Sequence, residues 1–117
     1  MLIGLASRLL IVLLLVIAPA HAQDGFVEGF EDLPLAPGLA SLPDAGTGFD
    51  KPTGRIVVAY ASGKTTRAAV ERFYSSTLPQ LGWSRQGGAY LREGEKLTIE
   101  ILGAESGVTV RYTLAPI

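Results

Sequence analysis

The chain has 117 residues, with ten lysine and arginine side chains, eleven aspartate and glutamate side chains and no cysteine, which gives a net charge of −1 at pH 7. A charge this close to zero gives no electrostatic reason to expect nucleic acid or an anionic membrane surface as a partner. The lack of cysteine excludes disulfides, so a domain of this length depends on its hydrophobic core alone.

Residues 1–22 have the features of a secretory signal peptide. Arg8 precedes an uninterrupted apolar run over 9–18, and residues 20–22 have the small-x-small pattern Ala-His-Ala that a signal peptidase cleaves. The apolar run is shorter than the about 20 residues of a membrane-spanning helix. We therefore expect cleavage before Gln23 and an exported, periplasmic product without a stable membrane span.

Residues 23–54 differ from the rest of the chain because they are rich in glycine, proline and acidic side chains. Glycine and proline at this density disfavour a long helix or a central strand. The same segment carries more phenylalanine and leucine than a disordered tail usually does. The sequence therefore predicts an extended arm, loose at its start and docked at its later part on a compact domain formed by residues 55–117.

The compact domain is expected to begin with a buried strand over 55–61, where β-branched and aromatic residues follow one another. Thr65 is expected to cap a helix whose apolar residues recur at helical spacing. Pro79 should disturb the last turn, and Gly82 should end the helix in the left-handed conformation. The apolar stripe of this helix consists of Val70, Phe73, Tyr74, Thr77, Leu78 and Leu81.

Four short strands follow, over 83–86, 89–93, 96–102 and 108–114, with a Gly-Gly pair as the hairpin turn between the first two. The last two strands alternate apolar and polar residues, so one face of the sheet should pack on a core while the other meets water. This pattern, β-α-β-β-β-β, predicts an α+β fold in which a single helix packs on one face of a five-stranded, mainly antiparallel sheet. The expected strand order is 1-5-4-3-2, with the first strand beside the last.

The stretch 70–83, with the pattern V-x-x-F-Y-x-x-x-L-x-x-x-G-W, resembles a signature of small exported bacterial domains of unknown function. The arm sequences over 31–39 and 49–56 resemble a narrower group among Gram-negative bacteria. This resemblance implies an extended arm, a strand, the helix and a β meander in an envelope protein. It implies no catalytic residue, since the group has none to transfer.

Patterns for catalysis or metal binding are sparse. The sole histidine, His21, lies in the predicted signal peptide, so the exported chain has neither histidine nor cysteine for a catalytic triad or a usual zinc site. Residues 63–66, Gly-Lys-Thr-Thr, lie where a phosphate-binding loop would lie, but the position of the motif's first glycine is Val58. Lys64 and Thr65 remain candidates for binding an anion at the start of the helix. We expect no enzyme activity and no cofactor.

The aromatic and aliphatic arm indicates a non-enzymatic binding or adaptor domain. We expect it to engage another envelope protein, through the arm or by strand addition at a sheet edge. The alternative is a small-ligand module that holds a lipid or an anionic glycan between helix and sheet. Three arginines are expected on the solvent face of the sheet. The candidate partner-binding residues are Phe26, Phe30, Leu33, Leu35, Arg85, Arg92 and Arg111.

Overall fold

The computed structural model of the chain describes residues 25–104 and 107–117. The predicted signal peptide, residues 1–22, therefore lies outside the described residues. Within the described ranges, no helix is both long enough and apolar enough to cross a membrane.

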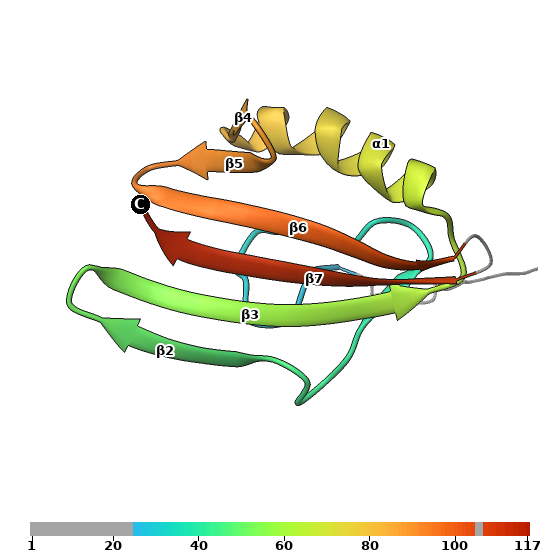
Figure 1. Cartoon of the computed structure of the whole chain (residues 1–117), viewed down its shortest axis with the longest axis horizontal. Coiled ribbons are helices and arrows are strands. Elements are labelled where there is room, and N and C mark those ends of the chain that lie inside the picture. The colour runs from blue at the N-terminus through green and yellow to red at the C-terminus, as the bar shows by residue number, and fades with distance from the viewer. Residues whose placement is uncertain (1–24, 105–106) are drawn as a thin grey trace, which may run out of the picture.

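One antiparallel sheet and one helical segment make up the described part of the chain (Figure 1). The helical segment is an α-helix that passes directly into a turn of 3-10 helix. In chain order, the elements are β1 (Leu39–Ser41), β2 (Thr47–Lys51), β3 (Gly54–Gly63), α1 (Arg67–Thr77), η2 (Leu78–Leu81), β4 (Ser84–Gln86), β5 (Ala89–Arg92), β6 (Glu95–Ala104) and β7 (Gly107–Pro116).

The sheet has the strand order β1-β3-β7-β6-β5-β4, and β2 also pairs with β3. The predicted α+β class and the predicted order of the five strands from β3 to β7 are confirmed. The sheet has seven strands instead of the predicted five, because the arm supplies β1 and β2. These two strands pair with successive parts of the same edge of β3, at residues 61–63 and 54–58. At an edge, a strand tolerates the nearby glycine and proline that argued against a central strand.

The helical segment begins at a residue whose side chain caps it and ends at a glycine in the left-handed conformation. Thr66 caps α1, and its Oγ1 accepts a hydrogen bond from the backbone nitrogen of Ala69 at 3.1 Å. The prediction of Thr65 as the cap is therefore wrong by one residue. The chain changes to η2 around Pro79, and Gly82 ends that turn with φ 95°. The predicted disturbance at Pro79 and the predicted stop at Gly82 are confirmed.

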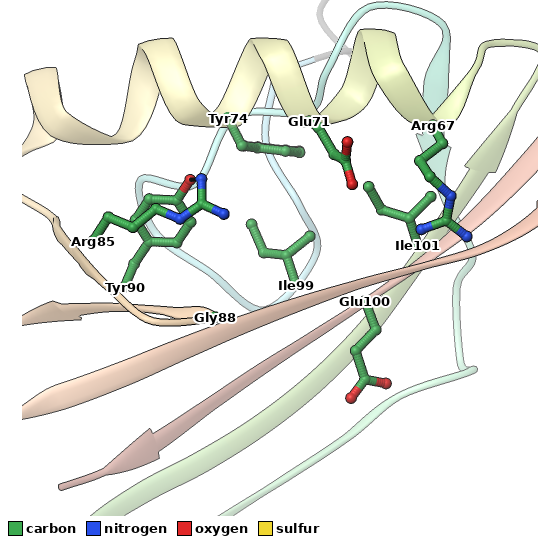
Figure 2. A pocket seen from close by; sticks show the side chains of 9 residues that line it. All are labelled: Arg67, Glu71, Tyr74, Arg85, Gly88, Tyr90, Ile99, Glu100 and Ile101. Atoms are coloured by element: carbon green, nitrogen blue, oxygen red, sulfur yellow. Dashed lines mark hydrogen bonds between the residues drawn. The ribbon is translucent and has the colours of Figure 1, made fainter.

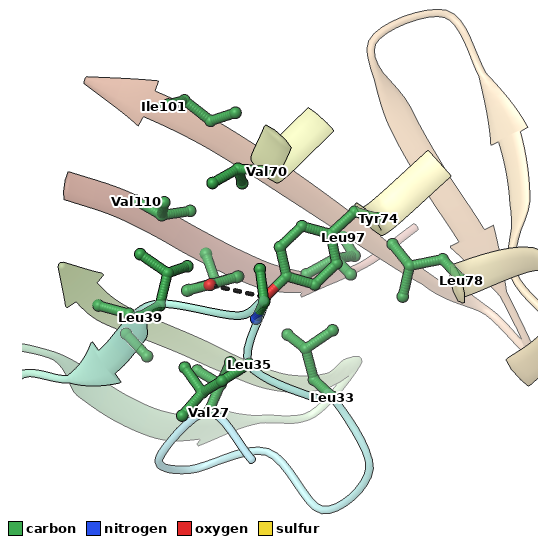
Figure 3. Close-up of a cluster of buried hydrophobic side chains, with 14 of the residues drawn as sticks. Val27, Leu33, Leu35, Leu39, Val70, Tyr74, Leu78, Leu97, Ile101 and Val110 are labelled. Atoms are coloured by element: carbon green, nitrogen blue, oxygen red, sulfur yellow. Dashed lines mark hydrogen bonds between the residues drawn. The ribbon is translucent and has the colours of Figure 1, made fainter. Parts of the chain in front are cut away.

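The core lies on one face of the sheet, beneath both α1 and the arm. Figure 3 shows arm residues such as Val27 and Leu33 in the same cluster as Val70 and Tyr74 of α1. Among the arm residues that the structure describes, burial begins at Val27, so the expectation that only the later part of the arm docks is corrected. The first two residues of the predicted loose start, 23 and 24, lie outside the described residues. The sheet contributes alternate residues of β7, as predicted from the period of two. These buried residues are Val108, Val110, Tyr112 and Leu114.

Two tyrosine hydroxyls join the arm, the helix and the sheet inside this core. The Tyr74 hydroxyl donates to the carbonyl oxygen of Pro34 at 2.8 Å and accepts from the backbone nitrogen of Ala36 at 3.2 Å. The Tyr112 hydroxyl lies 2.8 Å from that of Tyr74 and, because the Tyr74 proton is already used, acts as the donor. Burial raises the pKa of Tyr74 to about 12 and raises the pKa of Tyr112 as well.

Replacing Tyr74 with phenylalanine should destabilise the fold more than replacing Tyr112. Y74F keeps the ring but leaves the Pro34 carbonyl, the Ala36 N–H and the Tyr112 hydroxyl without their shared partner. A buried polar group without a partner costs about 1–3 kcal/mol, so we expect Y74F to lose about 2–3 kcal/mol of unfolding free energy in urea. Y112F removes one of the three bonds. An equal or smaller loss in Y74F than in Y112F would contradict this account.

The raised pKa of Tyr74 also predicts a loss of stability at alkaline pH. Tyrosine ionises near 10.0 in an unfolded chain and near 12 at this buried position. Between these values the unfolded chain binds fewer protons than the folded one, so the unfolding free energy falls as the pH rises from about 10 to about 12. The expected loss, followed by urea unfolding at stepped pH, is about 2–3 kcal/mol. The Y74F variant should show a clearly shallower decline, and an identical decline would disprove this assignment.

Candidate functional site

A difference in strand length leaves part of β6 without a neighbour. β6 has ten residues, whereas β5 has four and pairs only with residues 95–98. From Ile99 onward β6 pairs with β7 on one side, and none of the described strands pairs with its other side. Alternate residues of an antiparallel strand direct their backbone N–H and C=O groups to opposite neighbours. Residues 99–103 therefore present an open edge with unpaired backbone groups, and Figure 1 shows β6 continuing well past β5 beside α1.

A pocket of about 330 Å³ lies along this open edge. Ile99 and Ile101 of β6 form its floor and point toward α1, while Arg67 and Glu71 of α1 point back toward them (Figure 2). Arg85 of β4 lies at the end near the β4–β5 hairpin. The pocket thus has an apolar floor, a charged wall and an adjacent row of free backbone groups, so it forms a groove beside a strand edge.

The charges along the groove alternate in sign. Figure 2 shows Arg85 at one end, Arg67 at the other and Glu71 between them. Arg85 is held in place by Tyr90, because its Nη1 donates to the phenol oxygen at 3.2 Å and its guanidinium lies 5.3 Å from the ring centroid. Among the residues that the structure describes, no carboxylate oxygen lies within 4.0 Å of either guanidinium. Both arginines therefore keep their charge available to an incoming group.

The three arginines predicted on the solvent face do not share one face. Arg85 pairs across the hairpin with Tyr90, whose side chain is buried on the helix side, and Arg92 follows Tyr90 by two residues on that same side. Arg111 precedes the buried Tyr112, so it lies on the opposite face. The expectation of a shared face is thus corrected, because Arg85 and Arg92 lie in register with the buried Tyr90, whereas Arg111 alternates with the buried Tyr112.

Two of these arginines already have partners within the chain. Arg92 bonds both carboxylate oxygens of Asp32 in the arm, at 2.9 and 3.2 Å, and its guanidinium lies 4.2 Å from the ring centroid of Trp83. The hydrogen bond from Arg92 lowers the pKa of the Asp32 carboxyl. Arg111 forms an ion pair with Glu100 on the outer face. Arg92 fastens the arm to the domain, and only Arg85 of the three faces the groove.

The arm residues proposed for partner binding lie mostly in the core. Leu33 and Leu35 are 2% and 8% exposed, and Phe30 makes an edge-to-face contact with Tyr112 at 6.2 Å. Phe26 alone among the four is largely exposed, at 56%. The physical reason is coverage, because α1 is too short to cover the inner face of β3 and β7. The structure therefore uses Phe30, Leu33 and Leu35 for folding, which removes these three from a partner-binding surface.

The structure gives little support to the candidate anion site at Lys64 and Thr65. Lys64 is exposed, and Thr65 lines a shallow hollow beside Phe73. The start of α1 already has an internal acceptor, since the Thr66 side chain bonds the Ala69 N–H. The groove residues Arg67, Glu71, Ile99 and Ile101 were not singled out as a site from the sequence. One feature of the sequence could have revealed them: the predicted strand over 96–102 is longer than the hairpin strand that precedes it, so part of the longer strand has no partner on that side.

No family model matches the chain, and neither a curated protein nor a solved structure matches it. Within residues 25–104 and 107–117, no group of three or more histidine, cysteine, aspartate or glutamate side chains is placed to hold a metal ion. The geometry of the groove is thus the feature from which a function can be argued.

Hydrogen exchange should reveal the open edge in the free protein. Amide protons that point away from β7 at alternate positions over 99–103 should exchange rapidly, because no neighbouring strand protects them. The intervening amides bond to β7, and the amides of β7 lie between two strands, so both sets should exchange slowly. Residue-resolved exchange followed by NMR provides the measurement. Uniformly slow exchange over 99–103 would show that the edge is covered.

Proposed function

We propose that this protein is a non-enzymatic binding domain of the bacterial envelope that captures an extended segment of another envelope protein by strand addition to β6. The observation that carries the proposal is the open edge over 99–103, which lies beside a groove with an apolar floor. Export is supported by the signal pattern of residues 1–22. The resemblance to small exported domains points to the same compartment.

Strand addition uses both parts of the site. The partner's backbone pairs with residues 99–103 and continues the line of β5, and alternate side chains enter the groove above Ile99 and Ile101. A backbone hydrogen bond contributes only about 0.5–1.5 kcal/mol net. Pairing over so short a stretch is therefore weak by itself, and the contacts in the groove must supply the rest of the affinity and the selectivity.

The edge of β2 is less suited to this role. β2 ends in Asp50 and Lys51, and Pro52 follows directly. Charged side chains and proline are the usual protection of an edge strand against pairing. The open stretch of β6 has the sequence Ile-Glu-Ile-Leu-Gly, and Glu100, its sole charged residue, is paired with Arg111. The β6 edge thus lacks the protection that β2 has.

An anionic glycan in the same pocket is the second candidate function. Two arginines face a space of about 330 Å³, which suits a small acidic ligand. A lipid held between helix and sheet is disfavoured, since Tyr74, Leu97 and Val110 fill that layer at 2% exposure or less. A glycan needs the two arginines but no free backbone, whereas a captured strand needs the free backbone of residues 99–103.

Site-specific photocross-linking in intact cells tests the proposal. A photoreactive residue at Leu102, which is 49% exposed beside the open edge, should cross-link to one envelope protein through an extended segment. Phe49 on β2 is 55% exposed at the opposite edge and is the matched control. Cross-linking from position 102 but not from 49 is expected. Cross-linking from 49 alone, to a second copy of this chain, or from neither position would contradict the proposed function.

A further inference from the structure

Arg67 of α1 and Arg85 of β4, the two arginines of the groove, differ from the other arginines on the strands of the sheet. Arg55 of β3, Arg92 of β5 and Arg111 of β7 each pair with a carboxylate. Arg67 and Arg85 face the groove without such a pair among the described residues. Two arginines without a carboxylate partner among the described residues thus lie at the two ends of one groove, where their charges are open to carboxylates of a ligand.

The spacing of the charged side chains on α1 matches the spacing of side chains along an incoming strand. Arg67 and Glu71 lie four residues apart on α1, a rise of about 6 Å along the helix. Side chains on one face of a strand recur every two residues, or about 6.6–6.8 Å. Two successive groove-facing side chains of a captured strand therefore match Arg67 and Glu71 in spacing. Figure 2 shows Arg85 beyond Glu71 along the groove, on the side toward which such a strand continues.

We propose that the captured segment carries the pattern acidic-x-basic-x-acidic, with all three charged side chains facing α1. The inference rests on the proposed strand addition and specifies its ligand. The acidic side chains pair with Arg67 and Arg85, and the basic one pairs with Glu71. Glu71 also acts against a uniformly acidic segment, because it would face a carboxylate across the groove. The pattern reads the same in both directions, so parallel and antiparallel addition make the same three pairs.

Three synthetic peptides test this pattern. Each has capped ends and a threonine-valine flank on both sides of a five-residue centre. The first centre is Glu-Thr-Lys-Thr-Glu. The second, Lys-Thr-Glu-Thr-Lys, has the charges reversed, and the third, Gln-Thr-Gln-Thr-Gln, is neutral. The affinities are measured by calorimetric titration of the full chain without its signal peptide. The first peptide should bind about tenfold more tightly than the neutral one, and the charge-reversed peptide should bind most weakly. The preference should shrink as salt rises, since these charges are partly exposed.

Charge variants assign the preference to the groove. The double variant R67E/R85E should bind the reversed peptide in preference to the first one. R72E is the matched control, because Arg72 also lies on α1 but lines a different hollow, and it should leave the ranking unchanged. Equal affinity of all three peptides would overturn the charge pattern and leave strand addition standing. Binding of none of them, with the edge amides still exchanging rapidly, would overturn both.

Discussion

The buried contact between the Tyr74 and Tyr112 hydroxyls is the point at which the three parts of the fold meet. Tyr74 stands on α1, Tyr112 on β7, and the same hydroxyl of Tyr74 serves the Pro34 carbonyl and the Ala36 N–H of the arm. A helix of eleven residues cannot cover the whole inner face of this sheet, so the arm covers β3 and β7 in its place. The segment 27–39 therefore supplies side chains to the core, and its deletion would remove these before it removed a binding surface. The core side chains of this segment are Val27, Leu33, Leu35, Ala36 and Leu39.

The same anchoring positions the groove. Val70, Tyr74 and Leu78 hold α1 against the sheet, so its N-terminal half runs beside β6 where β5 has already ended. The two sides of the groove, α1 and β6, thus both belong to packed elements. The tyrosine contact and the β4–β5 hairpin fix the separation between them. A groove whose backbone belongs to packed elements needs little rearrangement of the backbone on binding, which favours capture of a short segment.

Much of the fold could be predicted from the sequence because it depends on local periodicity. The alternation in β7, the apolar stripe of α1 and the stop at Gly82 follow directly from residue type. The two arm strands could not be predicted, since their pairing with β3 is set by tertiary contact and not by local propensity. The groove was missed for a related reason: it arises from the different lengths of two neighbouring strands. Arg85 was a candidate from the sequence but was assigned to the other face, and Arg67 looks like an ordinary solvated residue.

Strand addition at β6 has one direct test, the solution structure of the complex with the Glu-Thr-Lys-Thr-Glu peptide. Isotope-filtered nuclear Overhauser spectra report which protons of the chain lie next to the peptide backbone. Strand addition predicts a continuous ladder of contacts between the peptide backbone and residues 99–103, with the peptide side chains adjacent to Ile99 and Ile101. Contacts confined to β2 or to the outer face, or contacts with Arg67 and Arg85 without a backbone ladder, would contradict it.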